Sequence, residues 1–288
     1  MPQREVRVES GDYLRVTSFP VRKSAKGRRR CKAQPTSEVQ ALLNERNRQY
    51  YFSDLLLCNF TPDDIFLTLT YRDECMPHDA EEAKREFRNF IRRVNWKRKK
   101  KGLEPAKYIY VTERGEKSGR IHHHVFISGG LDRTELEEIW GNGHANSRVL
   151  QFDENGLAGL VRYSLKSGEY NPDEENGKVG YRTWSGSKNL AKPKRRQSDS
   201  HIRVKDAAYI DEHPDDYDYI RRLYPGYYVA RVEGTARSGL DLPEKSPIPR
   251  AHFITIWLYK ADTDLFGYRR SLARCKKSRE KEKEWMKS

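Results

Sequence analysis

The segment Ile121–Ile127 constrains the fold of this chain most strongly, because its sequence Ile-His-His-His-Val-Phe-Ile is typical of a β-strand. Side chains along a strand alternate between two faces, so His122 and His124 share one face and His123 lies on the other with apolar neighbours. Two imidazoles side by side on a rigid strand make half of a site for a divalent metal ion. The segment therefore predicts a sheet strand and also the position of a candidate site.

A second strand is predicted at Tyr108–Thr112, directly before Glu113. The polar, glycine-bearing turn Arg114–Arg120 joins it to the histidine strand, which predicts an antiparallel hairpin. Glu113 is thus a candidate third ligand, and its face depends on the strand register, which the sequence leaves open. Two imidazoles and one carboxylate suit Mn²⁺ or Mg²⁺ acting on phosphate oxygens, and the nitrogen ligands favour Mn²⁺.

Two further elements have clear patterns. Alternation in Ile65–Tyr71 predicts a strand whose odd-numbered side chains face one way. Asp79 and Glu82 have the spacing of an N-terminal capping box, which predicts the start of a helix. The apolar face of that helix consists of Ala83, Phe87, Phe90, Ile91 and Val94.

The order of the predicted elements indicates an α+β fold. The other predicted elements before residue 170 are a helix that follows Thr36-Ser37 and runs through Leu57, helices at Thr134–Trp140 and Leu157–Lys166, and a strand at Ser147–Phe152. This order favours a mostly antiparallel sheet with helices packed on one face.

Three regions are expected along the chain. Residues 1–35 are polar and basic and should form a flexible arm, and residues 36–205 should form the main domain, with a loop-like stretch at 171–205. Residues 206–288 should be a small C-terminal α/β extension of unknown role. The elements predicted there are a short helix at Asp215–Tyr224, strands at Tyr227–Val232 and His252–Tyr259, and a charged helical tail ending at Glu280–Ser288.

Charge favours a polyanionic partner. The 288 residues carry a formal net charge of +14, and Lys and Arg gather in clusters. Such clusters are better indications of a phosphate track than a uniform excess, although solvated helix ends and tails look similar. The candidate DNA-binding residues are Lys97, Arg98, Lys188, Lys192, Lys194, Arg195 and Arg196.

Several classes of protein are disfavoured by what the sequence lacks. The four cysteines form no Cys-x-x-Cys pair, which argues against a zinc ribbon and a secreted disulfide scaffold. No stretch approaches the roughly 20 apolar residues of a membrane helix, so we expect a soluble cytoplasmic protein with no membrane partner. No Gly-x-x-x-x-Gly-Lys-[Ser/Thr] sequence is present, so no ATP site is expected.

Tyr163 is the candidate nucleophile. It lies on the helix predicted after the histidine strand, and Lys166 follows three residues later on the same helical face. A phenol has a reference pKa of about 10, so attack on phosphorus needs a nearby cation and a metal that polarises the phosphate. Tyr170 is the second choice, because Gly168 and Pro172 indicate that the helix ends before it.

These motifs together resemble the HUH endonucleases. The strand at Phe66–Tyr71, the histidine run His122–His124 and the segment Tyr163–Lys166 match the three motifs of that family in order, over about residues 55–170. Within the family, the chain is most similar to the rolling-circle replication initiator (Rep) proteins of small single-stranded DNA phages and related plasmids or prophages. Residues Tyr181–Pro193 also resemble a region that follows the third motif in the phage proteins.

The resemblance implies a fold, a mechanism and partners. The fold would be an RRM-like antiparallel sheet, with His122, His124 and Glu113 holding the metal. Tyr163 would attack single-stranded DNA at a replication origin, leaving a 5′-phosphotyrosine and a free 3′-OH, while Lys166 positions the tyrosine or the phosphate. A host helicase and polymerase would act as partners.

Two features depart from the family pattern. The helix before Tyr163 carries no second tyrosine, which favours a single-tyrosine mechanism. The middle residue of the histidine run is His123 rather than a hydrophobic residue, so the metal-binding pair is assigned by alternation alone.

Two other functions fit the same residues. A single-tyrosine HUH transposase or mobilisation relaxase would share this core. A non-catalytic nucleic-acid-binding protein would instead stack bases on Tyr108, Tyr110 or Phe126 and track phosphates with its basic clusters.

Overall fold

The computed structural model describes residues 2–21, 38–115, 119–165, 184–234 and 252–261. Among these residues, no helix is both long enough and apolar enough to cross a membrane. Lys166, Tyr170 and the helical tail predicted at Glu280–Ser288 lie outside the described residues.

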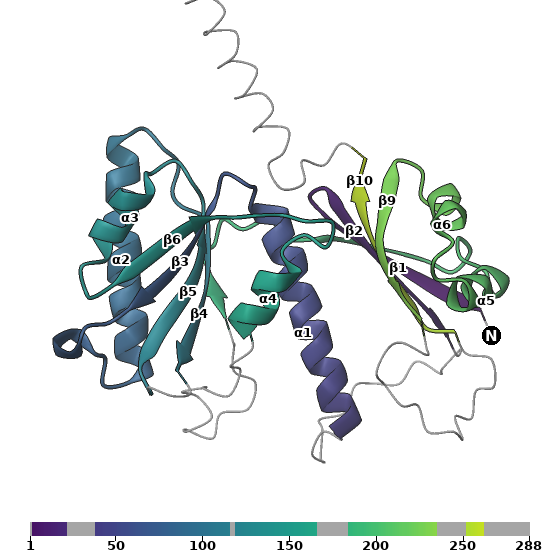
Figure 1. Ribbon diagram of the computed structural model, residues 1–288, viewed down its shortest axis with the longest axis horizontal. Coiled ribbons are helices and arrows are strands. Elements are labelled where there is room, and N and C mark those ends of the chain that lie inside the picture. Colours follow the sequence, from purple (N-terminus) through teal and green to yellow (C-terminus); the bar gives the residue numbers. More distant parts are fainter. Residues whose placement is uncertain (1, 22–37, 116–118, 166–183, 235–251, 262–288) are drawn as a thin grey trace, which may run out of the picture. The chain divides into compact units, whose positions relative to one another are not determined.

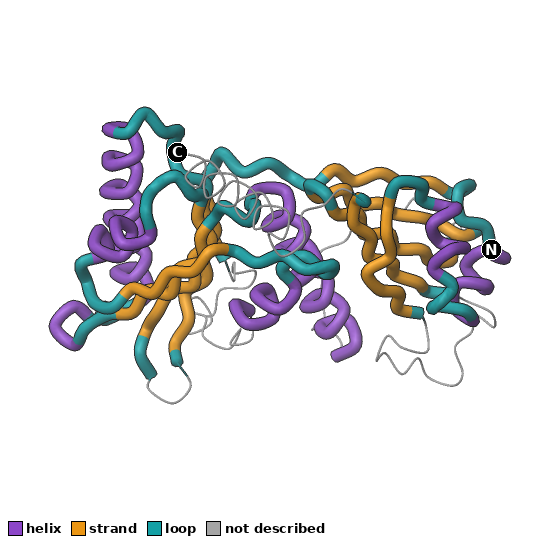
Figure 2. Tube along the Cα trace, turned by 45° about the horizontal axis from the view of Figure 1, so that its top comes forward, coloured by secondary structure: helices purple, strands orange, loops and turns teal. Residues whose placement is uncertain are grey.

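The chain folds into two compact units, each of which combines helices with strands (Figure 2). The histidine unit comprises the described residues within 59–152 and 157–191. The second unit comprises those within 1–58, 153–156 and 192–265. The fold is α+β, as predicted, with one antiparallel sheet in each unit.

In the histidine unit the strand order is β6-β3-β5-β4-β7, which puts the histidine strand at the centre. The strands are β3 (Ile65–Thr70), β4 (Tyr108–Arg114), β5 (Ile121–Ile127), β6 (Ala145–Val149) and β7 (Ser185–Gly186). The helices are α2 (Ala80–Lys100), α3 (Arg133–Trp140) and α4 (Ala158–Leu165), with a short 3₁₀ turn, η1, at Asp73–Cys75. The predicted hairpin of β4 and β5 is confirmed, as are β3 and the three helices.

Helix α2 covers one face of this sheet through its apolar stripe. The side chain of Asp79 caps the helix by accepting a hydrogen bond from the Glu82 backbone N–H at 2.7 Å. All of the predicted apolar residues are buried, and they pack with the odd-numbered side chains of β3: Ala83, Phe87, Phe90, Ile91, Val94, Ile65, Leu67, Leu69 and Tyr71. Burial of this stripe is the main hydrophobic contribution to the unit.

The prediction that all helices lie on one face of the sheet is wrong. Figure 1 shows α2 and α3 on one side of the sheet and α4 on the other. The Tyr163 ring of α4 meets the His124 ring, which belongs to the face opposite His123. Helix α4 therefore lies over the sheet face that carries the candidate metal ligands.

The second unit has the strand order β8-β1-β2-β10-β9. Its strands are β1 (Gln3–Ser10), β2 (Tyr13–Pro20), β8 (Lys194–Ser198), β9 (Tyr227–Glu233) and β10 (Ile254–Lys260). Its helices are α1 (Glu38–Asn59), whose last residue belongs to the histidine unit, α5 (Val204–Glu212) and α6 (Tyr217–Leu223). Helices α5 and α6 share a buried apolar cluster with β2, β9 and β10.

The expected flexible arm is incorrect for residues 3–20, which form the β1–β2 hairpin. Short apolar alternation among charged residues hid these strands: Val6, Val8, Leu14 and Val16 are buried, whereas Arg7, Glu9 and Arg15 are half-buried. Gly11 at the turn has φ +62°, and a Cβ there would lie 2.5 Å from the Leu57 carbonyl oxygen. Only glycine fits both conditions without strain.

The expected domain boundary at residue 205 also differs from the structure. Strand β8, which lies in the stretch predicted to be a loop, pairs antiparallel with β1 and so joins the second unit. Its sequence Lys-Arg-Arg-Gln-Ser has no apolar alternation, and its strand conformation comes from pairing with the edge of β1. Helix α5 was not predicted either.

Candidate metal centre and nucleophile

Strand register brings Glu113 onto the same face as His122 and His124. Glu113 on β4 lies directly opposite His122 on β5. The Glu113 Oε2 atom is 3.1 Å from His124 Nε2 and 3.6 Å from His122 Nε2. One nitrogen or oxygen from each residue lies within 4.8 Å of the others. The register that the sequence left open thus completes a three-residue cluster.

The second nitrogen of each imidazole faces a protein oxygen. His122 Nδ1 lies 3.3 Å from the Arg120 carbonyl oxygen, and His124 Nδ1 lies 3.4 Å from Thr68 Oγ1. With a metal ion bound, a proton on each Nδ1 would leave each Nε2 lone pair free to act as a ligand beside the Glu113 carboxylate. The donor set of two imidazoles and one carboxylate therefore fits a divalent metal ion.

Burial restricts the mobility of the cluster. The His124 side chain is almost fully buried and stacks on Phe66, with ring centroids 5.7 Å apart and an interplanar angle of 17°. His122 and Glu113 are partly exposed and form the accessible side of the cluster.

Electrostatics couple Glu113 to His122. Burial alone would lower the pKa of His122, but the hydrogen bond and charge of Glu113 outweigh it and raise this pKa above its ordinary value. A cation is thus favoured beside this carboxylate, whether it is a proton on the imidazole or a metal ion.

Tyr163 lies next to this cluster. Its ring centroid is 4.9 Å from that of His124 and 6.4 Å from that of Phe66. Its side chain is 51% exposed, so the tyrosine is accessible to a large substrate. The structure therefore brings together four of the predicted site residues, Glu113, His122, His124 and Tyr163.

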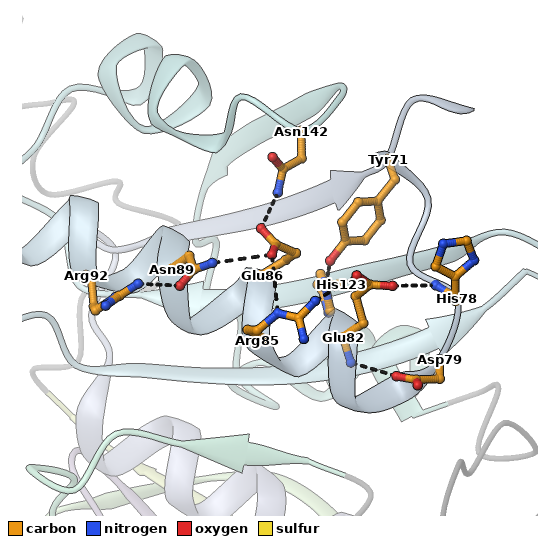
Figure 3. Close-up of polar contacts among 10 residues, drawn as sticks. All are labelled: Tyr71, His78, Asp79, Glu82, Arg85, Glu86, Asn89, Arg92, His123 and Asn142. Carbon is orange, nitrogen blue, oxygen red and sulfur yellow. Dashed lines mark hydrogen bonds and ion pairs between the residues drawn. The ribbon is translucent and has the colours of Figure 1, made fainter. Parts of the chain in front are cut away.

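His123 belongs to the opposite face. It is fully buried, and its Nε2 lies 2.7 Å from the Tyr71 hydroxyl (Figure 3). Its Nδ1 lies 2.9 Å from Thr112 Oγ1. Burial is the largest cause that lowers its pKa, to about 3. His123 is a neutral core residue, and it lies on the sheet face opposite His122 and His124, as the alternation predicted.

Arg98 is buried and does not form part of a DNA-binding surface. Its guanidinium donates hydrogen bonds to the carbonyl oxygens of Glu104, Ser128 and Gly129 at 2.7, 3.3 and 2.6 Å. These bonds fasten the C-terminal end of α2 to two loops. Lys97, one residue earlier, is part-exposed and lies 3.4 Å from Glu135.

The other candidate DNA-binding residues are exposed and divided between the two units. Lys188 lies in the histidine unit, and Lys192, Lys194, Arg195 and Arg196 lie in the second unit.

Two of the three aromatic residues proposed for base stacking on the sheet are covered. Tyr110 stacks on Phe87 of α2 with ring centroids 3.8 Å apart, and Tyr108 meets the same Phe87 at 5.7 Å. Phe126 is fully buried between Phe60 and Phe66. Tyr110 and Phe126 are therefore unavailable for base stacking, whereas Tyr108 is half-buried and meets Phe87 edge-on, so its stacking role stays a prediction.

Sequence reasoning missed the residues that contact the Nδ1 atoms of the candidate ligands His122 and His124. Thr68 lies directly opposite His124 in the β3–β5 pair, so its position depends on a register between strands far apart in the chain. Arg120 contributes its carbonyl oxygen, for which side-chain identity gives no signal.

Comparison with known proteins gives one match. Residues 64–168 match the family model described as Replication-associated protein ORF2/G2P. Searches of curated proteins and of solved structures found no match. The matched segment contains Glu113, His122, His124 and Tyr163, and it confirms the resemblance to replication proteins that the motifs predicted. Residues 64–168 of the chain are therefore similar to the replication-associated protein ORF2/G2P family.

Proposed function

We propose that this protein initiates rolling-circle replication as an HUH-type endonuclease that nicks and rejoins single-stranded DNA. The observation that supports the proposal best is the proximity of Tyr163 to His124, with 4.9 Å between ring centroids. A half-exposed phenol beside a cluster of metal-binding type has the parts needed for attack on a phosphodiester. The family match supports a role in DNA replication.

Glu113, His122 and His124 would hold the metal ion, Mn²⁺ or Mg²⁺. When bound, the metal supplies a positive charge that polarises a phosphate oxygen and offsets negative charge in the transition state. Thr68 and the Arg120 carbonyl hold the imidazole rings in the orientation that presents Nε2.

Tyr163 would carry out the transfer. Its phenol oxygen would form a bond to phosphorus as the bond from phosphorus to the 3′ oxygen breaks; the phenol proton would pass to solvent, and the departing 3′ oxygen would take up a proton from solvent. The products are a 5′-phosphotyrosine and a 3′-OH end that can prime synthesis by a host polymerase. Rejoining reverses the step, with the 3′-OH as nucleophile. Lys166 is proposed to position the tyrosine or the phosphate.

A covalent-adduct assay tests this proposal. Protein with Mn²⁺ is mixed with labelled single-stranded oligonucleotides from its own genomic neighbourhood and run on a denaturing gel. We expect a shifted band that disappears in Tyr163→Phe and in His122→Ala and persists in the control Tyr217→Phe, which alters an exposed tyrosine of the second unit. Binding without any adduct under any metal would leave a non-catalytic nucleic-acid-binding protein.

The same assay addresses the transposase or relaxase alternative. A replication initiator should cleave and rejoin one origin sequence. If the protein joined two different DNA ends as readily as it nicked an origin, the chemistry would stand and the biological role would change.

A further inference from the structure

A pocket of about 500 Å³ lies in the second unit, apart from the candidate metal centre in sequence and in unit. Its lining comes from β1, β8 and the turn that follows β8: Glu5, Arg7, Arg196, Gln197, Ser198, Ser200 and His201. We infer that this pocket, called the phosphate pocket below, binds a phosphate group of single-stranded DNA. The inference rests on the proposed function, since it takes DNA as the polyanion.

The accessible side chains of the phosphate pocket include two guanidinium groups. Arg196 is 71% exposed and Arg7 is 30% exposed, whereas Glu5, the carboxylate in the lining, is 0% exposed. His201 is partly exposed and adds an imidazole that is cationic when protonated. The surface that a ligand would meet therefore favours an anion.

The two arginines are direct cross-strand neighbours. Arg7 on β1 lies opposite Arg196 on β8 in the antiparallel pair. Like charges directly opposite on one sheet face are destabilising, so this arrangement costs stability in the free protein. A phosphate between them would relieve the repulsion. Glu9 partly balances Arg196 at 3.5 Å, with most of the Arg196 side chain left in solvent.

Glu5 holds the basic groups in place from the floor of the pocket. Its Oε1 atom accepts hydrogen bonds from Arg7 Nε at 2.8 Å and from the Tyr224 hydroxyl at 2.6 Å, and its Oε2 lies 3.2 Å from His201 Nδ1. The Arg7 guanidinium also lies over the Tyr224 ring, 5.1 Å from its centroid. Because Glu5 engages Nε, the bond leaves the terminal guanidinium nitrogens as donors for a second acceptor.

The turn after β8 is also fixed. Ser198 Oγ accepts hydrogen bonds from the backbone N–H groups of Ser200 and His201, both at 3.3 Å. Arg4 binds Asp199 through two hydrogen bonds of 2.7 Å. A turn held in this way presents His201 and Ser200 to the phosphate pocket in one arrangement, which lowers the entropy cost of binding.

Fluorescence anisotropy with labelled single-stranded DNA, over a series of NaCl concentrations, tests the inference. The Tyr163→Phe background prevents cleavage, so the readout is independent of the proposed nicking step. We expect Arg196→Gln and Arg7→Gln each to weaken binding about tenfold at low salt and to reduce the slope of log K against log [salt] by about 0.7. The control is Lys205→Gln, which removes one exposed positive charge in the same unit outside the lining.

A second arm separates the two sources of phosphate. Deoxyadenosine triphosphate is titrated against the same variants and followed by isothermal titration calorimetry. If both variants lost binding of deoxyadenosine triphosphate while the salt slope for DNA binding stayed unchanged, the pocket would be assigned to a free nucleotide. Variants that match Lys205→Gln in both arms would overturn the inference.

Two further checks show whether each variant folds and whether the pocket inference fails independently of the nicking proposal. Circular dichroism checks each variant, and Arg196→Gln carries the test if Arg7→Gln does not fold, because the Arg196 side chain is mostly in solvent. If no Tyr163 adduct forms but the salt slope falls in Arg196→Gln, the phosphate pocket stands and the nicking proposal fails.

Discussion

The two faces of strand β5 give the same side chain opposite roles. His122 and His124 meet a carboxylate on one face, and the effect of that carboxylate outweighs burial and raises the pKa of His122 above its ordinary value. His123, between them in sequence, faces the core beneath α2, where burial lowers its pKa to about 3. The environment supplied by the neighbouring strands, rather than the residue type, decides which histidine is suited to chemistry.

The substitution with the largest expected effect lies on the face of β5 that carries His122 and His124. His124→Ala removes an imidazole that meets both Glu113 and Tyr163. We expect affinity for Mn²⁺ to fall at least about 100-fold and adduct formation to be lost, since loss of a ligand should exceed the 10- to 100-fold cost of losing an outer-shell partner. Isothermal titration calorimetry with Mn²⁺ measures the affinity, and unchanged affinity would contradict the assigned site.

His123→Ala should have the opposite pattern. It removes a buried ring and leaves the Tyr71 hydroxyl without its partner at 2.7 Å. We expect a loss of about 3 kcal/mol in the free energy of unfolding, with Mn²⁺ affinity nearly unchanged in the folded fraction. Urea denaturation measures the loss of stability. A stable variant that no longer bound Mn²⁺ would contradict the account, because it would assign metal binding to the face of His123.

Acid should destabilise the protein through His123. The unfolded chain takes up a proton on this residue below its ordinary pKa of 6.5, while the folded protein does not until about pH 3. Between these values the unfolded state binds more protons, so stability falls as pH falls, by at most about 1.4 kcal/mol per pH unit.

Urea denaturation of the metal-free protein at several pH values from 6.5 to 4 measures this dependence. His123→Gln keeps the ability to hydrogen-bond and does not titrate, so its stability should depend less steeply on pH. Equal slopes for the two proteins would show that His123 is protonated in the folded state.

The smallest expected effect comes from the helix that covers the His123 face. Asp79→Ala removes the N-terminal cap of α2, whose bond to the Glu82 N–H is 2.7 Å. We expect a loss of about 1 kcal/mol in the free energy of unfolding and no change in Mn²⁺ affinity. Thermal melts with and without Mn²⁺ measure the loss of stability and the increase in Tm caused by the metal. A change only in the increase in Tm caused by Mn²⁺ would indicate that the two faces are coupled.

Local patterns predicted the elements of the histidine unit well. Short segments carry the alternation of β3 and β5 and the apolar stripe of α2. These segments form the predicted strands and helix in the folded protein. The shared face of His122 and His124 followed from the strand period alone.

Long-range pairing set the limit of prediction. The position of Glu113 beside the histidines depends on register, and Thr68 comes from a strand more than 50 residues away in sequence. Strand β8 has no strand pattern of its own and forms through its pairing with β1, which lies more than 180 residues earlier in the chain. A single sequence carries no local signal for such contacts.

The most direct test of the central claim is to map the covalent DNA adduct by mass spectrometry. Protein is incubated with an origin oligonucleotide and Mn²⁺ and then digested, and the nucleotide-bearing peptide is sequenced. The account predicts that the modified residue is Tyr163 and that chelation of the metal prevents the modification. Modification of Tyr170 or another residue, or an adduct that forms equally well without metal, would contradict it.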